Sequence, residues 1–387
     1  MVQLSKTRGL RPTALRLAVL ALAVCTGHAR ADDGFGYKLN AFGTLGATHS
    51  SEKRADYVSS VVRPTGAGFS GDWSTEVDSR LGAQVSATYG ERWSAILQLV
   101  TEQQWDGSHR PHVEWANVKY ALTPDLGVRA GRVALPVFLF SDTKVAYTLT
   151  SVRPATYFYS LLPITHSDGL DASWRSRFGD ATNTLTALAG KQDFIAADGS
   201  PEGNRFKVPG QYALVDKLEI GALTVQASYF AAHVRIPKLL AIPVPALSQA
   251  GDGWFRRAGL AFNYDPGKFF VLGEASRDSA QITGSRRAWY ASAGVRLGAF
   301  TPYVRYEKNS QGRQSPLFAD TSLTSTSVGV RWDFHSNMDL KIQHDRTRMG
   351  AQQLTGFGAV GPLANTQSGF RPGGSFSLTS IVLDFVF

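Results

Sequence analysis

The sequence predicts an all-β protein, an antiparallel transmembrane β-barrel of sixteen strands. Three observations support this fold class. Stretches of about ten residues alternate between apolar and polar side chains, the connections alternate between short and long, and the N-terminus has the pattern of an export signal. A tilted strand needs about 9 to 11 residues to cross the hydrocarbon layer of a membrane. The repeated stretches therefore have the length expected of barrel strands.

Residues 1–31 have the features of a cleaved signal peptide. Four basic residues precede an apolar run at 17–25, and Ala29-Arg30-Ala31 matches a cleavage site before Asp32. The run is shorter than the roughly 20 residues that a membrane-spanning helix requires. We therefore expect export and cleavage, with residues 32–387 forming the barrel.

Cys25 is the only cysteine of the chain, and it lies inside the predicted signal peptide. Leu22 to Cys25 resembles a lipoprotein signal, which is an alternative, although Val24 is bulkier than the small residue expected before a lipidated cysteine. The segment also holds five of the 40 basic residues and none of the 31 acidic ones, so 35 basic residues remain against 31 acidic ones. This small excess does not indicate nucleic-acid binding.

Alternation identifies the strands and assigns their faces. In 286–297, Trp289 and Val295 stand on one face, while Ser292 and Arg296 stand on the other. A Lys or Arg on the lipid side near the bilayer midplane costs about 2 to 4 kcal/mol, so the charged face must be the lumen. After residue 31, no run of 18 apolar residues is present, which excludes a helical membrane protein.

The connections between the strands carry topological information because they alternate between short and long. Bacterial barrels place short turns in the periplasm and long loops outside, and an even number of strands puts both termini in the periplasm. The strand at 211–219 alternates poorly and places Asp216 on its lipid face, which conflicts with its predicted register or boundary. The predicted strands are 38–49, 78–89, 93–102, 112–122, 126–133, 168–176, 181–190, 211–219, 223–231, 254–264, 269–277, 286–297, 300–308, 325–334, 338–346 and 376–387.

Aromatic residues gather beside the short turns, as expected for side chains at the headgroup level of a membrane. Packing at strand ends is the alternative explanation for any one of them. The set is Tyr89, Trp93, Tyr120, Phe178, Tyr264, Phe269, Phe300 and Phe334.

The last twelve residues resemble the C-terminal strand of Gram-negative outer-membrane β-barrels. Ile381, Leu383, Phe385 and Phe387 occupy alternate positions there, and Phe387 is the final residue. The resemblance implies that these four residues form the signal read by the barrel-assembly machinery. The terminal strand of a soluble β-sandwich is the alternative.

The architecture resembles the general porins of the Gram-negative outer membrane, in local sequence at the ends and near residues 128–172. That segment reads Val128-Arg129-Ala130-Gly131-Arg132, and later contains Val152-Arg153-Pro154 and Asp168-Gly169. The resemblance implies that the third long connection, 134–167, folds into the lumen and narrows it, the alternative being a loop over the mouth. It also implies a homotrimer surrounded by outer-membrane lipid and lipopolysaccharide, with no cofactor and no metal.

A sixteen-stranded barrel can enclose an aqueous channel, and inward-pointing charges would set its selectivity. We expect passive diffusion of ions and small hydrophilic solutes, with a mild preference for anions. Pairing of the charges along the wall, through Asp333, Asp339, Asp345 and Asp384, is the alternative and would remove the preference. The predicted lumen bases are Arg80, Lys119, Arg129, Arg175, Arg296, Arg305, Arg331 and Lys341, opposed by Asp142, Asp168 and Asp171 on or beside the third loop.

Enzymatic signatures are weak. His166-Ser167-Asp168 contains the residue types of a hydrolase triad, but adjacency in sequence is not the spatial relay that nucleophilic catalysis needs. The eight histidines lack the spacing of metal ligands. A Gly-x-Gly-x-x-Gly pattern at 356–361 has neither a strand before it nor a helix after it. A barrel that only anchors an enzyme or an adhesin remains the alternative function.

Overall fold

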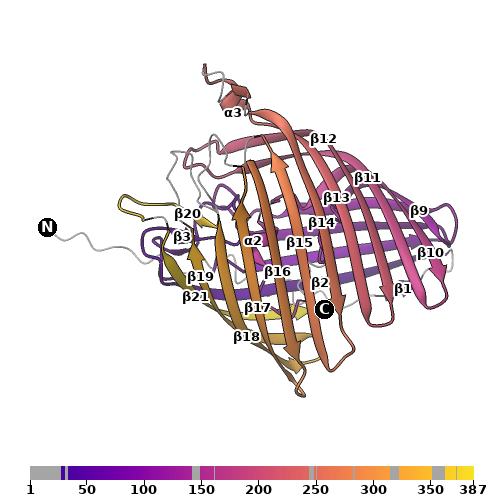
Figure 1. The fold of residues 1–387 in the computed structure, drawn as a ribbon. Helices are drawn as coiled ribbons and strands as arrows, with labels where there is room; N and C mark the ends of the chain where they lie inside the picture. Colours follow the sequence, from indigo (N-terminus) through magenta and orange to yellow (C-terminus); the bar gives the residue numbers. More distant parts are fainter. Residues whose placement is uncertain are drawn as a thin grey trace.

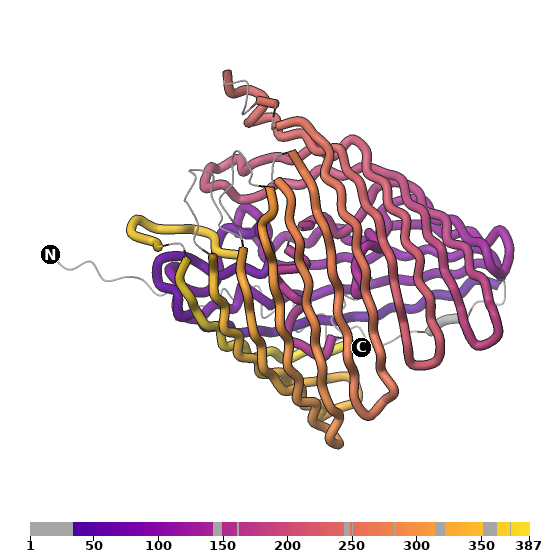
Figure 2. Tube along the Cα trace, viewed as in Figure 1, coloured from indigo at the N-terminus to yellow at the C-terminus, as the bar shows by residue number. Residues whose placement is uncertain are grey.

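The protein folds into a closed antiparallel β-barrel (Figures 1 and 2). The first barrel strand, β2 (Phe35–Ser50), pairs with β6 (Arg80–Tyr89) on one side and with the last strand, β21 (Ser375–Val386), on the other. The strands between pair with their neighbours in the chain, so the sheet closes into a ring of sixteen. The predicted fold class is confirmed.

The computed structural model describes residues 28–30, 34–141, 149–160, 162–243, 248–249, 251–281, 284–313, 322–350, 362–371 and 373–387. The remaining barrel strands are β7 (Trp93–Glu102), β8 (His112–Ala121), β9 (Leu126–Ala134), β10 (His166–Phe178), β11 (Ala181–Ala196), β12 (Asn204–Ile220), β13 (Leu223–Arg235), β14 (Asp252–Tyr264), β15 (Phe269–Ala280), β16 (Gly284–Val295), β17 (Phe300–Gln311), β18 (Leu323–His335) and β19 (Met338–Met349).

Short strands and helices lie before the first barrel strand and in the connections between the barrel strands. The strands β3, β4 and β20 form a small separate sheet, in which segments about 300 residues apart in sequence pair with one another. The helix α3 stands on the long connection between β13 and β14, which projects beyond the barrel (Figure 1). These elements are β1 (His28–Arg30), β3 (Asp56–Tyr57), β4 (Ala67–Gly68), β5 (Trp73–Ser74), α2 (Thr156–Tyr159), α3 (Pro237–Leu240) and β20 (Leu363–Ala364). No helix among the described residues is long and apolar enough to cross a bilayer.

Side chains alternate between the two faces of the wall, as the sequence predicts. On β17, Val304 is 55% exposed on the outer face, whereas Arg305 is 4% exposed on the lumen side. The aromatic residues beside the short turns lie on the outer face, with Phe178 at 68% exposure and Tyr89 at 61%. This end of the barrel, the short-turn end, therefore carries an aromatic ring where a membrane interface is expected.

The strands β11 and β12 extend well beyond their predicted bounds. β11 ends at Ala196 and β12 begins at Asn204. A connection of seven residues therefore replaces the predicted long loop at 191–210. The register of β11 against β12 shifts between Gly190 and Gln192, and that of β12 against β13 shifts between Lys207 and Gly210. Both shifts place the extra residue of a β-bulge on β12, between Val208 and Gln211. The bulge reverses the parity of the β12 residues beyond it, so the period of two is lost there.

The predicted register at Asp216, which placed this residue on the outer face, is correct. Asp216 lies on the outer face with Tyr212 and Leu214, and the Nδ2 of Asn183 donates a hydrogen bond of 2.6 Å to its Oδ1. The boundary of the strand was wrong, but its outward-facing positions were predicted correctly.

Candidate pore constriction

The connection between β9 and β10, residues 135–165, is called L3 below, and its described residues 135–141, 149–160 and 162–165 fold into the barrel. At its base the backbone N–H of Leu135 donates to the carbonyl of Thr165 at 3.0 Å. The loop then follows the inner wall, and α2 lies against β16 and β17. The predicted inward-folded third loop is confirmed.

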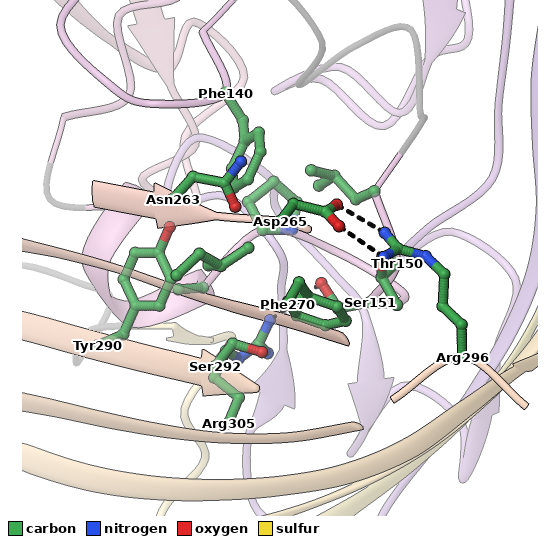
Figure 3. A pocket seen from close by; sticks show the side chains of 14 residues that line it. Phe140, Thr150, Ser151, Asn263, Asp265, Phe270, Tyr290, Ser292, Arg296 and Arg305 are labelled. Atoms are coloured by element: carbon green, nitrogen blue, oxygen red, sulfur yellow. Dashed lines mark hydrogen bonds and ion pairs between the residues drawn. The ribbon is translucent and has the colours of Figure 1, made fainter. Parts of the chain in front are cut away.

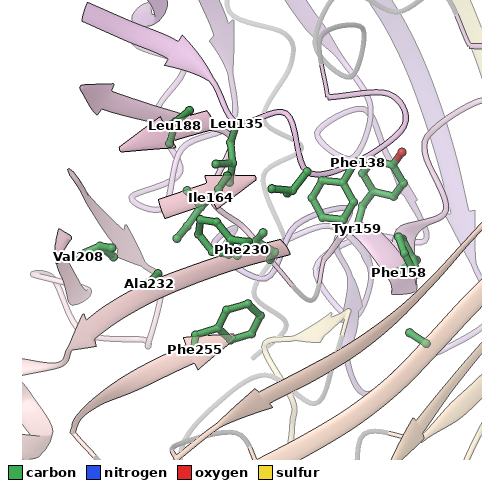
Figure 4. Close-up of a cluster of buried hydrophobic side chains, with 14 of the residues drawn as sticks. Leu135, Phe138, Phe158, Tyr159, Ile164, Leu188, Val208, Phe230, Ala232 and Phe255 are labelled. Atoms are coloured by element: carbon green, nitrogen blue, oxygen red, sulfur yellow. The ribbon is translucent and has the colours of Figure 1, made fainter. Parts of the chain in front are cut away.

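Apolar packing holds L3 against the wall formed by β11 to β16 (Figure 4). Phe138, Phe158 and Tyr159 from the loop pack with inward-facing Phe230 and Tyr290 from the wall. The rings of Phe138 and Tyr159 stack with centroids 4.3 Å apart, and Phe158 meets Tyr290 at 5.3 Å. This part of the lumen wall is apolar because it is covered by the loop rather than by water.

Charged groups are buried inside this contact. The Arg257 guanidinium lies 4.6 Å from the ring centre of Phe138 and 4.5 Å from that of Phe158, and its Nη1 is 3.2 Å from Asp278 Oδ2. Glu274 accepts hydrogen bonds from the Tyr159 hydroxyl at 2.5 Å and from the backbone N–H of Leu139 at 3.0 Å. Buried charges are tolerated only when they are paired and hydrogen-bonded, so these groups fix the position of the loop.

Arg153 anchors L3 to the strands that close the barrel. Its side chain is 3% exposed and binds Asp78 through Nη2 at 2.6 Å and Nε at 2.8 Å. The Nη2 also donates to Ser380 Oγ on β21 at 2.6 Å, and Nη1 lies 3.4 Å from Asp345 on β19. Thr48 on β2 completes the set at 3.2 Å. A single guanidinium therefore joins the loop to three strands of the closing region.

The protonation state of Asp78 supports this anchor. Burial alone would raise the pKa of Asp78, but the Arg153 guanidinium and the Thr48 hydroxyl hold it below its ordinary value. An acid whose pKa is lowered on folding stabilises the fold above its unfolded pKa of about 3.9, and this contribution is lost as the pH falls through the lower folded value. The anchor is therefore fully ionised at neutral pH.

The small sheet of β3, β4 and β20 covers the anchor. The Tyr57 ring lies 5.5 Å from the Arg153 guanidinium carbon, and its hydroxyl donates to Thr156 Oγ1 at 3.0 Å. Burial raises the pKa of Tyr57 to about 12, so the phenol remains a neutral donor. The first and third loops thus support each other.

Seven of the eight predicted lumen bases lie at inward positions of barrel strands, and Arg296 follows β16 in the next turn. Most are paired. Arg129 binds Asp171 at 2.6 Å, Arg331 binds Asp333 at 2.6 Å, and Lys341 binds Asp384 at 2.7 Å. Arg80 lies 3.7 Å from Glu102, Arg296 lies 2.6 Å from Asp265, and Arg305 lies 3.0 Å from Glu307. The alternative of pairing along the wall therefore describes six of the eight bases.

Lys119 and Arg175 differ from the other predicted bases. Both side chains are exposed, and both point into the lumen. Lys119 lies directly opposite the inward-facing Arg129, and Arg175 lies four residues after the inward-facing Asp171, on the same face of β10. Neither has an ion pair with any residue in the described ranges. Arg175 lies three residues from the short-turn end of β10, whereas L3 leaves the other end of that strand, so Arg175 does not stand beside the constriction.

The predicted acids are only partly on the lumen side. Asp171 is 3% exposed and faces inward. Asp168 faces outward instead, where Arg132 binds it at 2.7 Å, because it shares the parity of Leu170 and Trp174, which are 62% and 55% exposed. Its assignment to the lumen was wrong. Asp142 lies outside the described residues.

The residues that position L3 were not predicted. Glu274 and Glu307, the latter accepting a hydrogen bond of 3.0 Å from the backbone N–H of Tyr157, stand at inward positions of alternating strands, so parity alone could have identified them as lumen acids. Arg153 lies in the loop, where no period indicates the direction of a side chain. Its role depends on Asp78 and Asp345, which are 75 and 192 residues away in sequence.

A pocket of about 230 Å³ lies between L3 and the wall of β14 to β17 (Figure 3). Phe140 and Ser151 line it from the loop, and Tyr290 and Arg305 line it from the wall. At its edge Arg296 donates two hydrogen bonds to Asp265, which lower the pKa of that carboxyl. Over the described ranges, no three His, Cys, Asp or Glu side chains gather as a group that could hold a metal ion.

The chain resembles known proteins in sequence profile and in fold. The sequence profile of the Gram-negative porin family matches residues 17–352. No curated protein sequence matches the chain significantly. Similar solved structures include an anion-selective porin from Comamonas acidovorans, with 12% identity, a TM-score of 0.58 and coverage of 91% of this chain and 100% of that one.

Two further structures have the same fold. The outer membrane channel DcaP of Acinetobacter baumannii is 11% identical, with a TM-score of 0.57 and coverage of 93% of this chain and 99% of that one. In-vitro folded OmpT of Vibrio cholerae, in its trimer form, is 11% identical, with a TM-score of 0.52 and coverage of 91% and 99%. At these identities the structures establish the fold alone.

The closed sixteen-stranded wall, the inward-folded L3 and the charged lumen define an outer-membrane channel protein. Because the family profile covers most of the chain, this protein belongs to the Gram-negative porin family. It is a passive diffusion channel of the outer membrane. The short-turn end of the barrel is accordingly periplasmic, and the long-loop end is extracellular.

Replacing Arg153 with Ala should release L3. The substitution leaves Asp78 buried without its partner, and breaking a buried ion pair in this way typically costs about 3 to 5 kcal/mol. We expect larger and noisier single-channel conductance and faster proteolysis of L3. The conductance of the unsubstituted protein should stay constant between pH 8 and pH 5, because Asp78 remains ionised over that range.

Arg110→Ala is the matched control, because Arg110 is an exposed arginine in the connection between β7 and β8. It should leave conductance and proteolysis unchanged. Unaltered conductance and protease resistance in the Arg153→Ala variant would show that the anchor does not hold the loop.

Proposed function

We propose that the channel favours anions mildly. The observation that carries this proposal is the pair of lumen bases, Lys119 and Arg175, which have no ion-pair partner among the described residues. Inward acids on the same part of the wall are bound, Asp171 to Arg129 and Glu102 to Arg63, the latter at 2.5 Å. The packed part of L3 follows the wall from β11 to β21 and β2, so β6 to β10 lie on the remaining arc. The fold is compatible with this preference, since the Comamonas structure is an anion-selective porin.

Removing both free bases should shift the selectivity. In the Lys119→Gln/Arg175→Gln variant we expect the cation-to-anion permeability ratio, measured as reversal potential in a salt gradient, to rise about two- to threefold near 0.1 M salt. The difference should shrink at 1 M salt because the Debye length falls to about 3 Å.

Lys191→Gln/Lys207→Gln is the control. These two lysines stand at outward positions of β11 and β12, so replacing them removes the same amount of positive charge from outside the lumen. A reversal potential equal to that of the unsubstituted protein in both variants would refute the proposed anion preference.

The barrel acts as a channel rather than as an anchor for an enzyme or an adhesin in this proposal. The candidate triad cannot form a relay, because Ser167 and Asp168 are consecutive in β10 and point to opposite faces. Ser167 is buried on the lumen side, and Asp168 is bound to Arg132 outside. A loop that narrows the lumen serves a channel, whereas a barrel that only anchored an enzyme or an adhesin would not need one.

Residues 1–31 are proposed to be a cleaved signal peptide, on the grounds of their basic start, short apolar run and Ala-x-Ala site. The protein extracted from outer membranes should therefore begin at Asp32. Its N-terminal sequence and intact mass provide the test, and retention of Met1 would contradict the proposal.

The C-terminal strand is proposed as the assembly signal. Ile381 is exposed and Leu383 and Phe385 are partly exposed on the outer face, and Phe387 exchanges two backbone hydrogen bonds with Ala41 at 2.7 and 2.9 Å. Phe387→Lys keeps these backbone bonds but removes the terminal aromatic. We expect at least a fivefold loss of heat-modifiable protein in the outer membrane.

Ser375→Lys places the same charge on the outer face at the other end of β21 and should assemble normally. Equal amounts of folded protein from the two variants would argue against a signal function of the terminal residue.

Three copies are proposed to associate through the outer face of β2, β6, β7 and β8. The outward positions there include small residues on adjacent strands, such as Ala41, Ala83 and Ala95, and hold no Lys, Arg, Asp or Glu among the described residues. Small side chains let two walls approach closely. The trimer form of the Vibrio cholerae structure shows that this fold supports trimers in that protein.

Ala83→Phe should weaken the trimer, because a bulky ring would separate the walls. Ala291→Phe is the matched control, since Ala291 faces outward on β16, across the barrel. Light scattering in mild detergent should give a reduced mass for the first variant only. A monomeric unsubstituted protein, or an unaffected Ala83→Phe trimer, would rule out this interface.

A further inference from the structure

The pocket between L3 and the wall of β14 to β17 has a floor of neighbouring side chains (Figure 3). Asn263 lies directly opposite Leu272, Leu272 opposite Ser292, and Ser292 opposite Arg305, each in the pair formed by two adjacent strands. All four residues line the pocket. The geometry of the floor is therefore fixed by the register of four strands.

L3 forms the roof of the pocket and is tied to the floor. Phe140, Thr150 and Ser151 line the pocket from the loop. The Nη1 of Arg305 donates to the carbonyl of Arg153 at 2.9 Å and to Ser151 Oγ at 3.3 Å. A guanidinium of the floor thus holds the backbone of the roof, so the pocket is formed before any solute enters, as small-molecule sites usually are.

Apolar side chains line much of the pocket. Phe140, Phe270 and Tyr290 contribute aromatic rings, and Leu272 contributes aliphatic surface. The hydroxyl of Tyr290 already donates to Glu274 at 2.8 Å, so this residue offers its ring rather than a hydrogen-bond donor. A solute that fills the pocket therefore needs an apolar face.

The charged groups of the pocket are neutralised within the protein. Arg296 donates hydrogen bonds of 2.6 and 2.7 Å to the two carboxylate oxygens of Asp265. Arg305 lies 3.0 Å from Glu307. An incoming ion would have to give up its water and compete with these partners. The pocket therefore favours an uncharged solute, in contrast to the arc of β6 to β10.

The pocket also contains polar side chains that can bind a solute. Within the described part of the chain, the Asn263 amide and the Thr150 hydroxyl make no hydrogen bond with another residue. Ser292 Oγ donates to the carbonyl of Val304 at 3.1 Å, which leaves its oxygen as an acceptor. An amide side chain both donates and accepts, and so does a threonine hydroxyl. Such a set is matched by hydroxyl groups, which also donate and accept.

The size of the pocket limits the solute to a single ring. Its volume is about 230 Å³, whereas pockets for drug-sized molecules begin at about 300 Å³. Asp265 lies in the turn after β14 and Arg296 in the turn after β16, so the pocket extends from L3 towards the periplasmic end. A solute that has passed L3 from outside meets this pocket next.

We propose that this pocket binds a monosaccharide, that is, a neutral single ring that carries several hydroxyl groups. The aromatic and aliphatic side chains contact the C–H face of the ring, which removes apolar surface from water. The Asn263 amide and the Thr150 hydroxyl bind the hydroxyl groups and orient the ring. The site is separate from the proposed anion preference, which depends on charges on the other arc of the wall.

The test measures sugar binding to the open channel in a planar lipid bilayer. Added D-glucose should lower the KCl conductance and raise the current noise in a saturable way. Mannitol, an open-chain polyol, lacks the rigid ring and should bind more weakly. The Thr150→Val/Asn263→Leu variant keeps the approximate size of both side chains but removes their hydrogen bonds, so the half-saturating glucose concentration should rise about fivefold.

Asn40→Leu/Thr184→Val is the matched control, because it makes the same two changes at lumen positions of β2 and β11 that do not line the pocket. This variant should bind glucose as the unsubstituted protein does. Heat-modifiability and KCl conductance without sugar establish that each variant is folded. The single Thr150→Val variant, expected to shift the half-saturating concentration about twofold, replaces the double variant if that one fails to fold.

A glucose effect that does not saturate, or the same half-saturating concentration in the two double variants, would overturn the proposal. So would equal binding of mannitol and glucose, because the ring would then not be recognised. Tighter binding of sodium benzoate than of glucose would also overturn it, since the pocket would then select an aromatic acid through Arg296 or Arg305. These outcomes leave the test of the anion preference unaffected, because its reversal potentials are measured without sugar.

Discussion

The pairing of β2 with β21 is the contact on which the rest of the structure depends. A membrane offers no water to satisfy the backbone of an edge strand, so a sheet can span it only as a closed ring. Phe387 and Ala41 exchange backbone hydrogen bonds at the seam, and Arg153 joins L3 to both strands a few residues further along. Closure of the wall and placement of the loop are therefore supported by the same region of the barrel.

Docking of L3 divides the lumen into two chemical environments. Against β11 to β16 the loop buries aromatic rings and paired charges, and that part of the wall is packed as a protein interior. On the remaining arc the bases Lys119 and Arg175 stay exposed. A paired charge contributes little net field to a channel, and among the described residues Lys119 and Arg175 are the predicted lumen bases without an ion pair.

The outer surface is divided as well. Aromatic rings mark the periplasmic end, uncharged residues that include several alanines cover β2 and β6 to β8, and bases gather at the extracellular end of β14 to β19. The aromatic rings suit the interface between lipid and water, where amphipathic side chains are favoured. One barrel thus presents three distinct outer surfaces.

The sequence alone determined the number of strands, their order, the outward face of Ile381 and Phe385, and the inward folding of the third loop through its resemblance to porins. It could do so because the period of two is a local property of the backbone. It failed at Asp168, which was assigned to the lumen with the third loop although it shares the parity of the outward-facing Leu170, and along β12, where a bulge between Val208 and Gln211 reverses the parity. The partners of Arg153, and the neutralisation of Arg129 by Asp171, were decided only by the tertiary structure. Those contacts join residues from 42 to 192 positions apart, and no local pattern specifies which distant strands a closed barrel brings together.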